Sequence, residues 1–169
     1  MIFRKAMTED LEKLREVFGG IIEDMYAQGI DIWDDYYPCG LFPGDIARGE
    51  LYLLEDGEDV LAAFALTESN KGEKAVIWQE PEAKALYFDR FGVNHRYKRQ
   101  GIGSSAVEYA AQTAKNAGAK YLRLFVVDVN TPASALYEKN GFLRAGGYFD
   151  EYIDEDLTLR EFGYEKKLL

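Results

Sequence analysis

Two apolar repeats along the chain predict helices. Between residues 11 and 25, apolar side chains stand at positions 11, 14, 17, 18, 21, 22 and 25, the spacing of an amphipathic helix. Thr8 precedes this repeat as a suitable N-cap, while Gly19 and Gly20 predict a break within it. A second repeat starts at Ile102 and ends at Gly118, a residue type that often follows the last helical turn.

Shorter apolar runs bounded by turn residues predict strands. Two runs within Glu50–Glu68 are joined by a turn at Asp56 and Gly57, a pattern typical of a β-hairpin. The polar stretch Ser69–Lys74 predicts a second turn, and Asn130–Phe142 predicts a short helix with a proline near its start. Further strands are expected at residues 2–4, 85–93, 121–127, 142–149 and 157–167.

This order of elements predicts an α/β (α+β mixed) fold. We expect a central mixed, mostly antiparallel sheet with helices on both faces. The 169 residues are the length of one ordinary domain, so residues 1–169 are expected to form a single domain. One segment has no period: Asp31–Asp45 mixes aromatics, acids, prolines and glycines, which predicts a functional loop.

Composition narrows the class of protein. Hydrophobic residues make up 47% of the chain and aromatic residues 14%, which is typical of a globular protein. The single cysteine, Cys39, cannot form an internal disulfide, and no paired Cys/His spacing indicates a zinc or other metal site. No signal peptide or membrane span is recognisable, so we expect a protein of the reducing cytoplasm.

The net charge of −10 limits the partners of the chain. Such a charge repels nucleic acid and anionic membranes, so neither is expected as a partner, and it suits a cationic or neutral one. An anionic ligand needs a local exception. Arg90, His95, Arg96, Lys98 and Arg99 supply one within ten residues.

Directly after these basic residues, the segment Tyr97–Ala110 reads YKRQGIGSSAVEYA. Glycines let a backbone approach a ligand closely, and the N-terminus of a helix presents unpaired N–H groups to an anion. The segment therefore predicts a phosphate cradle. A plain loop-to-helix turn would have the same pair of glycines, so this alternative stays open from the pattern alone.

A dinucleotide site is a competing interpretation. Gly101, Gly103 and Ala106 satisfy G-x-G-x-x-G/A, and Asp128 follows about twenty residues later at a strand end. In that fold the glycine turn follows its strand directly, whereas residues 94–100 intervene here. An NAD-dependent oxidoreductase is therefore disfavoured. A P-loop is excluded because no lysine followed by serine or threonine stands after the second glycine.

Two motifs resemble the signatures of the Gcn5-related N-acetyltransferases. Lys98–Gly103, KRQGIG, is similar to the acyl-coenzyme A signature Q/R-x-x-G-x-G/A, and Asn130–Phe142, NTPASALYEKNGF, to the second signature of the family. With ALYFDRFGVNHRY upstream, the matches cover about Ala85–Phe142 in the family's order. The first signature position is Lys98 instead of Gln or Arg, which keeps a positive charge but loses the planar donor fork of arginine.

The resemblance implies acetyl-coenzyme A as the acyl donor. Backbone amides opening the helix would hold its diphosphate, assisted by the charge of Lys98, and the pantetheine arm would pair with the end of the preceding strand. Asn130 would bind the cofactor through its side chain, or would serve only as a helix N-cap. The implied cofactor-binding residues are Phe91, Gly92, Val93, Lys98, Arg99, Gln100, Gly101, Ile102, Gly103, Ser104 and Asn130.

The implied chemistry is transfer of the acetyl group to a primary amine by direct attack, so Cys39 is not needed as a nucleophile. Tyr137 stands at the family's proton-donor position, and its alternative role is ring packing between helix and sheet. Asp89 is the candidate general base, with Glu68, Asp128 or a water chain as alternatives. His95 has a surface role in this interpretation.

Aromatic and acidic residues in the loop Asp31–Asp45 predict the binding site of the acceptor amine. Trp33, Asp34, Asp35, Tyr36 and Tyr37 have the residue types that hold a cation, although they would also suit a packed lid. The function expected is an N-acetyltransferase acting on a small-molecule or peptide amine. A catalytically silent acyl-coenzyme A binding or sensing domain is the alternative, and the sequence leaves a homodimer open.

Overall fold

The computed structural model describes all residues, 1–169, and its internal contacts divide the chain into two compact units. The first comprises Met1–Leu66 and Arg90–Tyr109, and the second comprises Thr67–Asp89 and Ala110–Leu169. Strand β5 (Ala85–Val93) and helix α3 (Ile102–Asn116) each contribute residues to both. That residues 1–169 form a single domain stays a prediction.

The first unit has an antiparallel sheet that begins at the N-terminus. Strand β1 (Ile2–Lys5) pairs with β2 (Leu51–Asp56), and β2 pairs with β3 (Asp59–Thr67) through the expected turn at residues 57 and 58. Three 3-10 turns, Thr8–Asp10, Cys39–Leu41 and His95–Tyr97, accompany helices α1 (Leu11–Ala27) and α2 (Phe42–Ala47).

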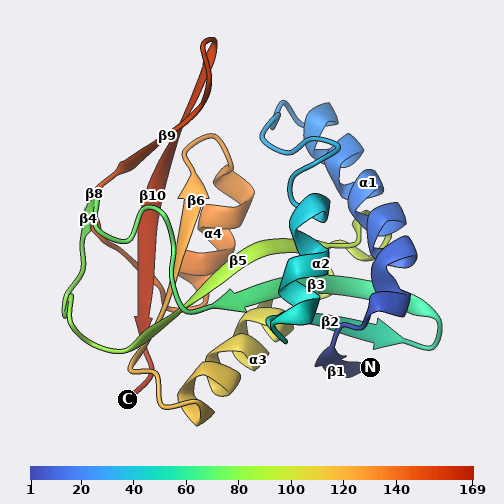
Figure 1. Ribbon diagram of the computed structural model, residues 1–169, viewed down its shortest axis with the longest axis horizontal. Coiled ribbons are helices and arrows are strands. Elements are labelled where there is room, and N and C mark those ends of the chain that lie inside the picture. Colours follow the sequence, from blue (N-terminus) through green and yellow to red (C-terminus); the bar gives the residue numbers. More distant parts are fainter. The chain divides into compact units, whose positions relative to one another are not determined.

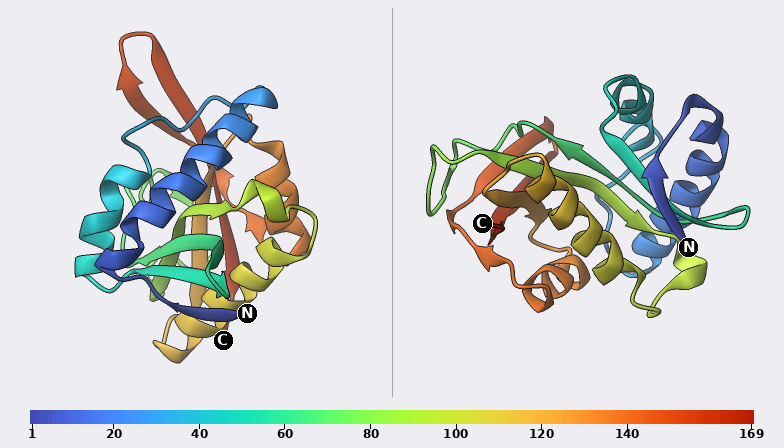
Figure 2. Two further views of the ribbon diagram at one scale, coloured as in Figure 1. Left: turned by 90° about the vertical axis from the view of Figure 1, so that its right-hand side faces the viewer. Right: turned by 90° about the horizontal axis from the view of Figure 1, so that it is seen from below.

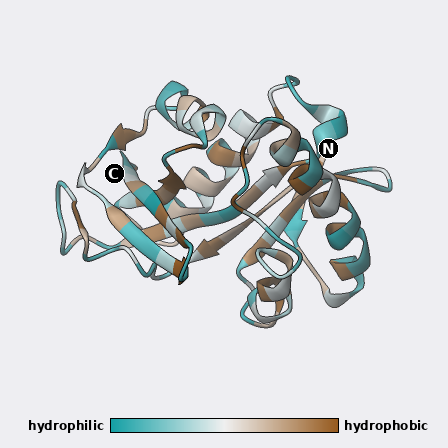
Figure 3. Ribbon diagram, turned by 90° about the horizontal axis from the view of Figure 1, so that it is seen from above, coloured by the Kyte–Doolittle hydropathy of each residue, from teal (hydrophilic) through white to brown (hydrophobic).

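Helices cover both faces of this first sheet, and the alternation of apolar residues along the strands explains why. Leu51 and Leu53 of β2 pack with α1 and α2, whereas Leu54 packs with Ile102 at the start of α3. Figures 1 and 2 show α1 and α2 together on one side of β2 and β3. Apolar colouring follows the strands, while the helices carry mixed colours (Figure 3).

The second unit contains the remaining strands. Residues Ala85–Tyr87 of β5 pair in parallel with β6 (Tyr121–Val127), and β6 pairs antiparallel with β10 (Leu157–Lys167). Strand β10 also pairs with β7 (Leu143–Arg144) and β9 (Phe149–Asp154), and β4 (Val76–Ile77) forms a separate small sheet with β8 (Gly146–Gly147). Helix α4 (Thr131–Lys139) completes the unit. Most pairings in both units are antiparallel, which confirms the expected mixed α/β fold class.

Three local predictions were wrong. Helix α1 continues through Gly19 and Gly20 without a break, because the chain packs tightly there instead of turning: a Cβ on Gly20 would lie 2.6 Å from Cε1 of His95. The segment 31–45 is not wholly irregular, since it includes the 3-10 turn Cys39–Leu41 and the start of α2, with a proline in the first turn of that helix. The strand expected at residues 142–149 is divided into β7, β8 and the start of β9.

The two neighbouring glycines of α1 generate the first prediction. Gly19→Ala should stabilise the protein by about 0.5–1 kcal/mol, because alanine has the higher helix propensity and no atom lies within 4 Å of the added Cβ. Gly20→Ala should lose most of that gain, because the ring of His95 must move. Urea unfolding of both variants measures the difference, and equal stabilisation by both would contradict the tight contact at Gly20.

Candidate functional site

In the first unit, the connection between β5 and α3 is held in place by Asn94. Asn94 is buried, its main-chain N–H donates to Leu61 O at 2.8 Å, and its side chain donates to Val60 O at 2.9 Å. Its Oδ1 also accepts a hydrogen bond from Arg96 N at 3.1 Å, which starts the turn His95–Tyr97. The first two bonds fix the chain on β3, and the third shapes the turn, immediately before the basic glycine segment. Sequence reasoning missed this residue, although Asn is a common cap of such turns.

The glycine segment itself is open to solvent and backs onto a helix. Arg99 and Gly101 have left-handed backbones, with φ angles of +61° and +77°, and Ser105 N donates to Gly101 O at 3.1 Å as the helix begins. Amides in the first turn of an α-helix have no partner within the helix. A Cβ on Gly101 would meet no atom within 4 Å, so the space beside Gly101 is open. The arrangement has the features of an anion cradle.

Two of the expected basic residues are engaged by carboxylates of the same unit. Lys98 Nζ lies 2.6 Å from Asp24 Oδ2 on α1, and Arg90 makes an ion pair with Asp45 on α2. Arg96 and Arg99 are exposed. The positive charge that an anion meets at the cradle is therefore smaller than the sequence alone indicates.

The end of β5 is irregular at the position before Phe91. Arg90 has a φ angle of +50°, so the regular alternation assumed for Asp89 with its neighbours along the strand is interrupted. Gly92 lies against α1, where an added Cβ would be 2.8 Å from Ile21 Cδ1 and 2.9 Å from Phe18 Cε1. Phe91 and Val93 pack beside the core cluster of Leu54 and Leu61.

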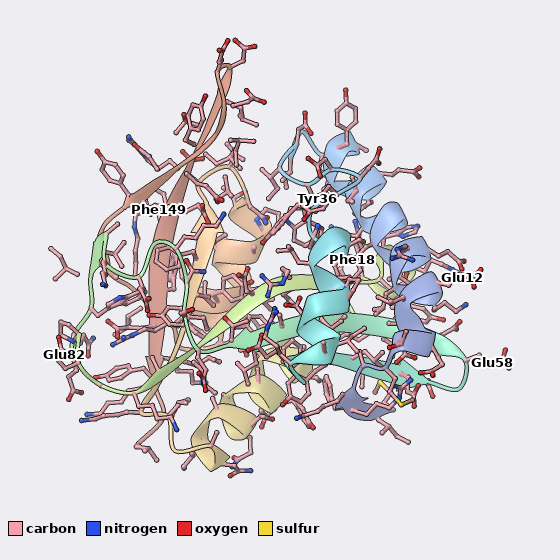
Figure 4. All side chains as sticks on the ribbon, viewed as in Figure 1. Glu12, Phe18, Tyr36, Glu58, Glu82 and Phe149 are labelled. Carbon is pink, nitrogen blue, oxygen red and sulfur yellow. The ribbon has the colours of Figure 1, made fainter.

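The predicted acceptor residues have unequal environments. Trp33 is half-buried and stacks on Phe18, with ring centroids 5.8 Å apart, so it contributes to the core. Asp34 Oδ1 accepts hydrogen bonds from the main-chain N–H groups of Tyr36 and Tyr37, and thus shapes the loop. Tyr36 is 67% exposed, and Figure 4 labels it in the loop. Phe18, also labelled there, packs against Phe42 of α2. Of the aromatic residues in this group, only Tyr36 is largely exposed.

In the second unit, Tyr137 is a buried phenol surrounded by aromatic rings. Its ring packs edge-on against Phe88 and Phe142, with centroids 6.3 Å and 5.8 Å away. Burial raises the pKa of Tyr137 well above its ordinary value, and the nearby negative charge of Asp89 raises it further. The hydroxyl group therefore keeps its proton at neutral pH and can donate a hydrogen bond, although the raised pKa makes it a weaker acid than an ordinary phenol.

The other predicted site residues of this unit are less buried than Tyr137. Asn130 Oδ1 accepts a hydrogen bond from Ala133 N at 3.4 Å, so Asn130 caps α4, and a role in cofactor binding stays a prediction. Asp128 and Glu68 are exposed. Asp89 is half-buried and electrostatically close to Tyr137.

Sequence reasoning also missed a carboxyl pair in the second unit. Glu161 on β10 and Glu151 on β9 share a hydrogen bond, and Glu151 Oε1 lies 3.2 Å from Lys71 Nζ. Burial, the bond to Glu151 and the charge of Asp89 together raise the pKa of Glu161 to about 9. Glu161 Oε2 is buried without a hydrogen-bond partner. No local sequence pattern signals this pair, because the two residues meet only through strand pairing.

Other features of the structure carry no comparable chemistry. A hollow of about 170 Å³ in the first unit is lined by Lys13, Asp59, His95 and their neighbours, and it is smaller than typical ligand pockets of about 300–1,000 Å³. No group of three or more His, Cys, Asp or Glu side chains is arranged to hold a metal ion. No helix has both the length and the apolar character needed to cross a membrane.

Comparison with known proteins gives consistent results. The family model described as "Acetyltransferase (GNAT) family" matches residues 18–142. A Bacillus subtilis (strain 168) protein, YwnH, whose name assigns it provisionally to the phosphinothricin acetyltransferases, is 29% identical over 105 residues, which are 62% of this chain and 60% of YwnH. The mycothiol acetyltransferase of Jonesia denitrificans is 38% identical over 68 residues, 39% of this chain and 22% of that protein. The matches thus span less than two thirds of either curated relative.

Solved structures share the fold over nearly the whole chain. A GNAT-family acetyltransferase from Streptococcus agalactiae 2603 superposes with a TM-score of 0.82 at 15% identity, covering 98% of this chain and 94% of that one. The PaiA N-acetyltransferase from Thermoplasma acidophilum, solved in complex with coenzyme A, gives a TM-score of 0.69 at 20% identity, covering 98% of each chain. At these identities the likeness supports the fold.

The carboxyl pair generates a prediction of pH dependence. Folded Glu161 holds its proton up to about pH 9, whereas the ordinary pKa of its carboxyl is 4.5, so the folded state binds more protons than the unfolded state between these values. Stability from this group is complete below pH 4.5 and is lost as pH rises toward 9. At about 1.4 kcal/mol per pH unit, this loss is on the order of 3–4 kcal/mol between pH 6 and 9, and Glu161→Gln should remove most of it. Urea unfolding at both pH values measures it, and an unchanged slope would contradict the raised pKa.

Proposed function

Because the chain belongs to the acetyltransferase (GNAT) family, we propose that it moves an acetyl group from acetyl-coenzyme A to a primary amine of a small molecule or peptide. The observation that carries the proposal is the exposed segment Lys98–Gly101, which leads into the first turn of α3 through the left-handed backbones of Arg99 and Gly101. A diphosphate suits this turn, because it can accept several main-chain hydrogen bonds and is favoured by the positive end of the helix dipole.

Residues at three places in the first unit would hold coenzyme A. The main-chain amides of residues 99–104 would hold the diphosphate, in the space that lies open at Gly101. The end of β5, Phe91, Gly92 and Val93, would bind the amides of the pantetheine arm as an added strand does. Lys98 forms an ion pair with Asp24, so it would attract the diphosphate less strongly than an unpaired lysine would.

When bound, acetyl-coenzyme A supplies a thioester whose carbonyl carbon the amine attacks, so that a C–N bond forms and the C–S bond breaks. Tyr137 would donate a hydrogen bond to the sulfur as the C–S bond breaks and so stabilise the departing thiolate, because its raised pKa keeps the phenol protonated at neutral pH. Asp89 would receive the proton of the amine, directly or through water. Glu161 is unsuited to that role, because it already carries a proton at neutral pH. A base matters most for a lysine-like amine, which costs about 4–5 kcal/mol to deprotonate at pH 7.

We propose a cationic amine as the acceptor. The net charge of −10 attracts such a substrate over long range. Tyr36, with Asp31 and Asp35 also exposed in the same loop, offers a ring face and carboxylates to a cation. Trp33 and Tyr37 would line this surface less directly, because both are half-buried. We further propose a reducing cytoplasm as the location, which suits the single free cysteine.

Binding of coenzyme A is the decisive test of the cradle. Coenzyme A should raise the melting temperature of the wild-type protein by several degrees, and NAD at the same concentration should leave it unchanged. Gly101→Leu should abolish the shift with coenzyme A, because the side chain would fill the space proposed for the diphosphate. A differential scanning fluorimetry series measures both effects.

Gly57→Leu is the matched control for Gly101→Leu. Gly57 lies in the turn between β2 and β3, has a φ angle of +62° and, like Gly101, has no atom within 4 Å of an added Cβ. Both substitutions therefore introduce similar backbone strain, but only the variant at Gly101 should lose the coenzyme A shift. Binding retained by Gly101→Leu would refute the cradle, and a shift with NAD alone would favour the dinucleotide interpretation.

The hydroxyl group of Tyr137, proposed to assist the departing thiolate, gives a separate kinetic prediction. Tyr137→Phe should lower kcat by about tenfold to a hundredfold with little change in coenzyme A affinity, because it removes the hydroxyl group and keeps the packed ring. Release of free thiol, measured across a panel of amines, gives kcat. Tyr152→Phe, at an exposed tyrosine of β9, is the control and should leave kcat unchanged. Equal rates for both variants would remove Tyr137 from the mechanism.

A further inference from the structure

A buried ion pair in the first unit lies next to the strand end proposed for pantetheine. Asp45 on α2 is completely buried, and the side chain of Arg90 on β5 is only 9% exposed. The contact is bidentate: Arg90 Nε lies 2.8 Å from Asp45 Oδ2, and Arg90 Nη2 lies 2.8 Å from Asp45 Oδ1. The two planar groups thus fix each other in both position and orientation.

The partner of Asp45 is also a residue with a strained backbone. Arg90 has a φ angle of +50°, a conformation that costs a non-glycine residue of order 1–3 kcal/mol and persists only where surrounding contacts impose it. The bidentate contact with Asp45 is such a constraint. Arg90 immediately precedes Phe91–Val93, so its conformation sets the direction in which the next N–H and C=O groups point.

The same short segment is held at its other end by Asn94. Asn94 bonds to Val60 and Leu61 of β3 through its side chain and its main-chain N–H. Between these two anchors, Gly92 has no freedom to move toward α1, because Phe18 and Ile21 occupy the space. Residues 91–93 are thus fixed at both ends by buried polar groups and on one side by packing.

We propose that Asp45 is a positioning residue for the pantetheine arm of coenzyme A. It holds Arg90 in the left-handed conformation and thereby aims the main-chain groups of Phe91 and Val93 at the amides of the ligand. This inference rests on the proposed function. A stabilising role alone does not explain the pair, because buried ion pairs contribute little net stability relative to apolar residues of the same size. Their advantage is defined geometry, and at this site the geometry is that of the binding strand.

The test compares coenzyme A with its nucleotide half, 3′-phosphoadenosine 5′-diphosphate, by titration calorimetry. Asp45→Asn removes the charge but keeps the shape, so it should weaken coenzyme A binding about tenfold, which corresponds to ~1.4 kcal/mol. The nucleotide half has no pantetheine arm, and its affinity should change less than twofold. A merely structural role would affect both ligands alike or neither, once both are measured at a temperature where the variant is folded.

Arg48→Ala is the matched control. Arg48 Nη2 also contacts Asp45 Oδ1, at 3.0 Å, but the side chain is 58% exposed and does not hold β5. This variant should bind both ligands as the wild type does. Arg90→Lys serves if Asp45→Asn does not fold, because it keeps a buried cation beside Asp45 but loses the bidentate fork, and it should again weaken coenzyme A selectively.

The outcomes separate this inference from the proposed function. Unchanged coenzyme A affinity in the folded variants, or an equal loss for both ligands, would overturn the positioning role of Asp45. Failure of the wild-type protein to bind either ligand would instead overturn the proposed function itself. Selective loss of coenzyme A, with Arg48→Ala unaffected, supports the role.

Discussion

The main-chain conformation between Arg90 and Gly101 is the constraint on which the proposed site depends. A helix N-terminus binds an anion only where the preceding chain turns aside and leaves the first amides uncovered. The left-handed residues Arg99 and Gly101 make that turn, and Asn94 ties its beginning to β3. The left-handed Arg90 marks the other limit of the segment. Backbone geometry, more than any one side chain, is what this protein would offer to coenzyme A.

The sequence predicted the elements where one physical signal dominates. Strands β5, β6 and β10 were predicted with their observed bounds, because β5 and β6 are largely apolar runs between turn residues and β10 is rich in aromatic and branched residues after an acidic turn. Helix α1 shows the opposite case: two adjacent glycines predict a break, but tertiary packing against His95 uses the missing side chain at Gly20. Helix α2 is only six residues long, too short for a periodic pattern to develop.

In the candidate site, too, some residues could be predicted from the sequence and others could not. Motifs predicted the glycine segment and Tyr137, because spacing along the chain identifies them. Motif spacing could not predict the contacts of Asp45, Arg90 and Glu161. Asp45 and Arg90 are 45 residues apart in the sequence. The pKa of Glu161 is raised only when β9 pairs with β10 and buries its carboxyl group. Sequence patterns report local geometry, whereas the electrostatic partners of a residue are decided by the tertiary fold.

The positive charge at the cradle is reduced by ion pairs that basic residues form with the many carboxylates of this acidic chain. With thirty acidic and twenty basic residues, a cation often has a carboxylate within reach, and Lys98 and Arg90 form ion pairs with Asp24 and Asp45. Each such pair lowers the field that a diphosphate would meet, leaving the exposed Arg96 and Arg99 as the nearest side-chain charges of the segment. Main-chain amides are not neutralised by this competition, because their partial charges are fixed by the helix. In a protein of net charge −10, main-chain amides would therefore attract an anionic ligand at the cradle alone. The remaining acidic surface would still attract a cationic acceptor.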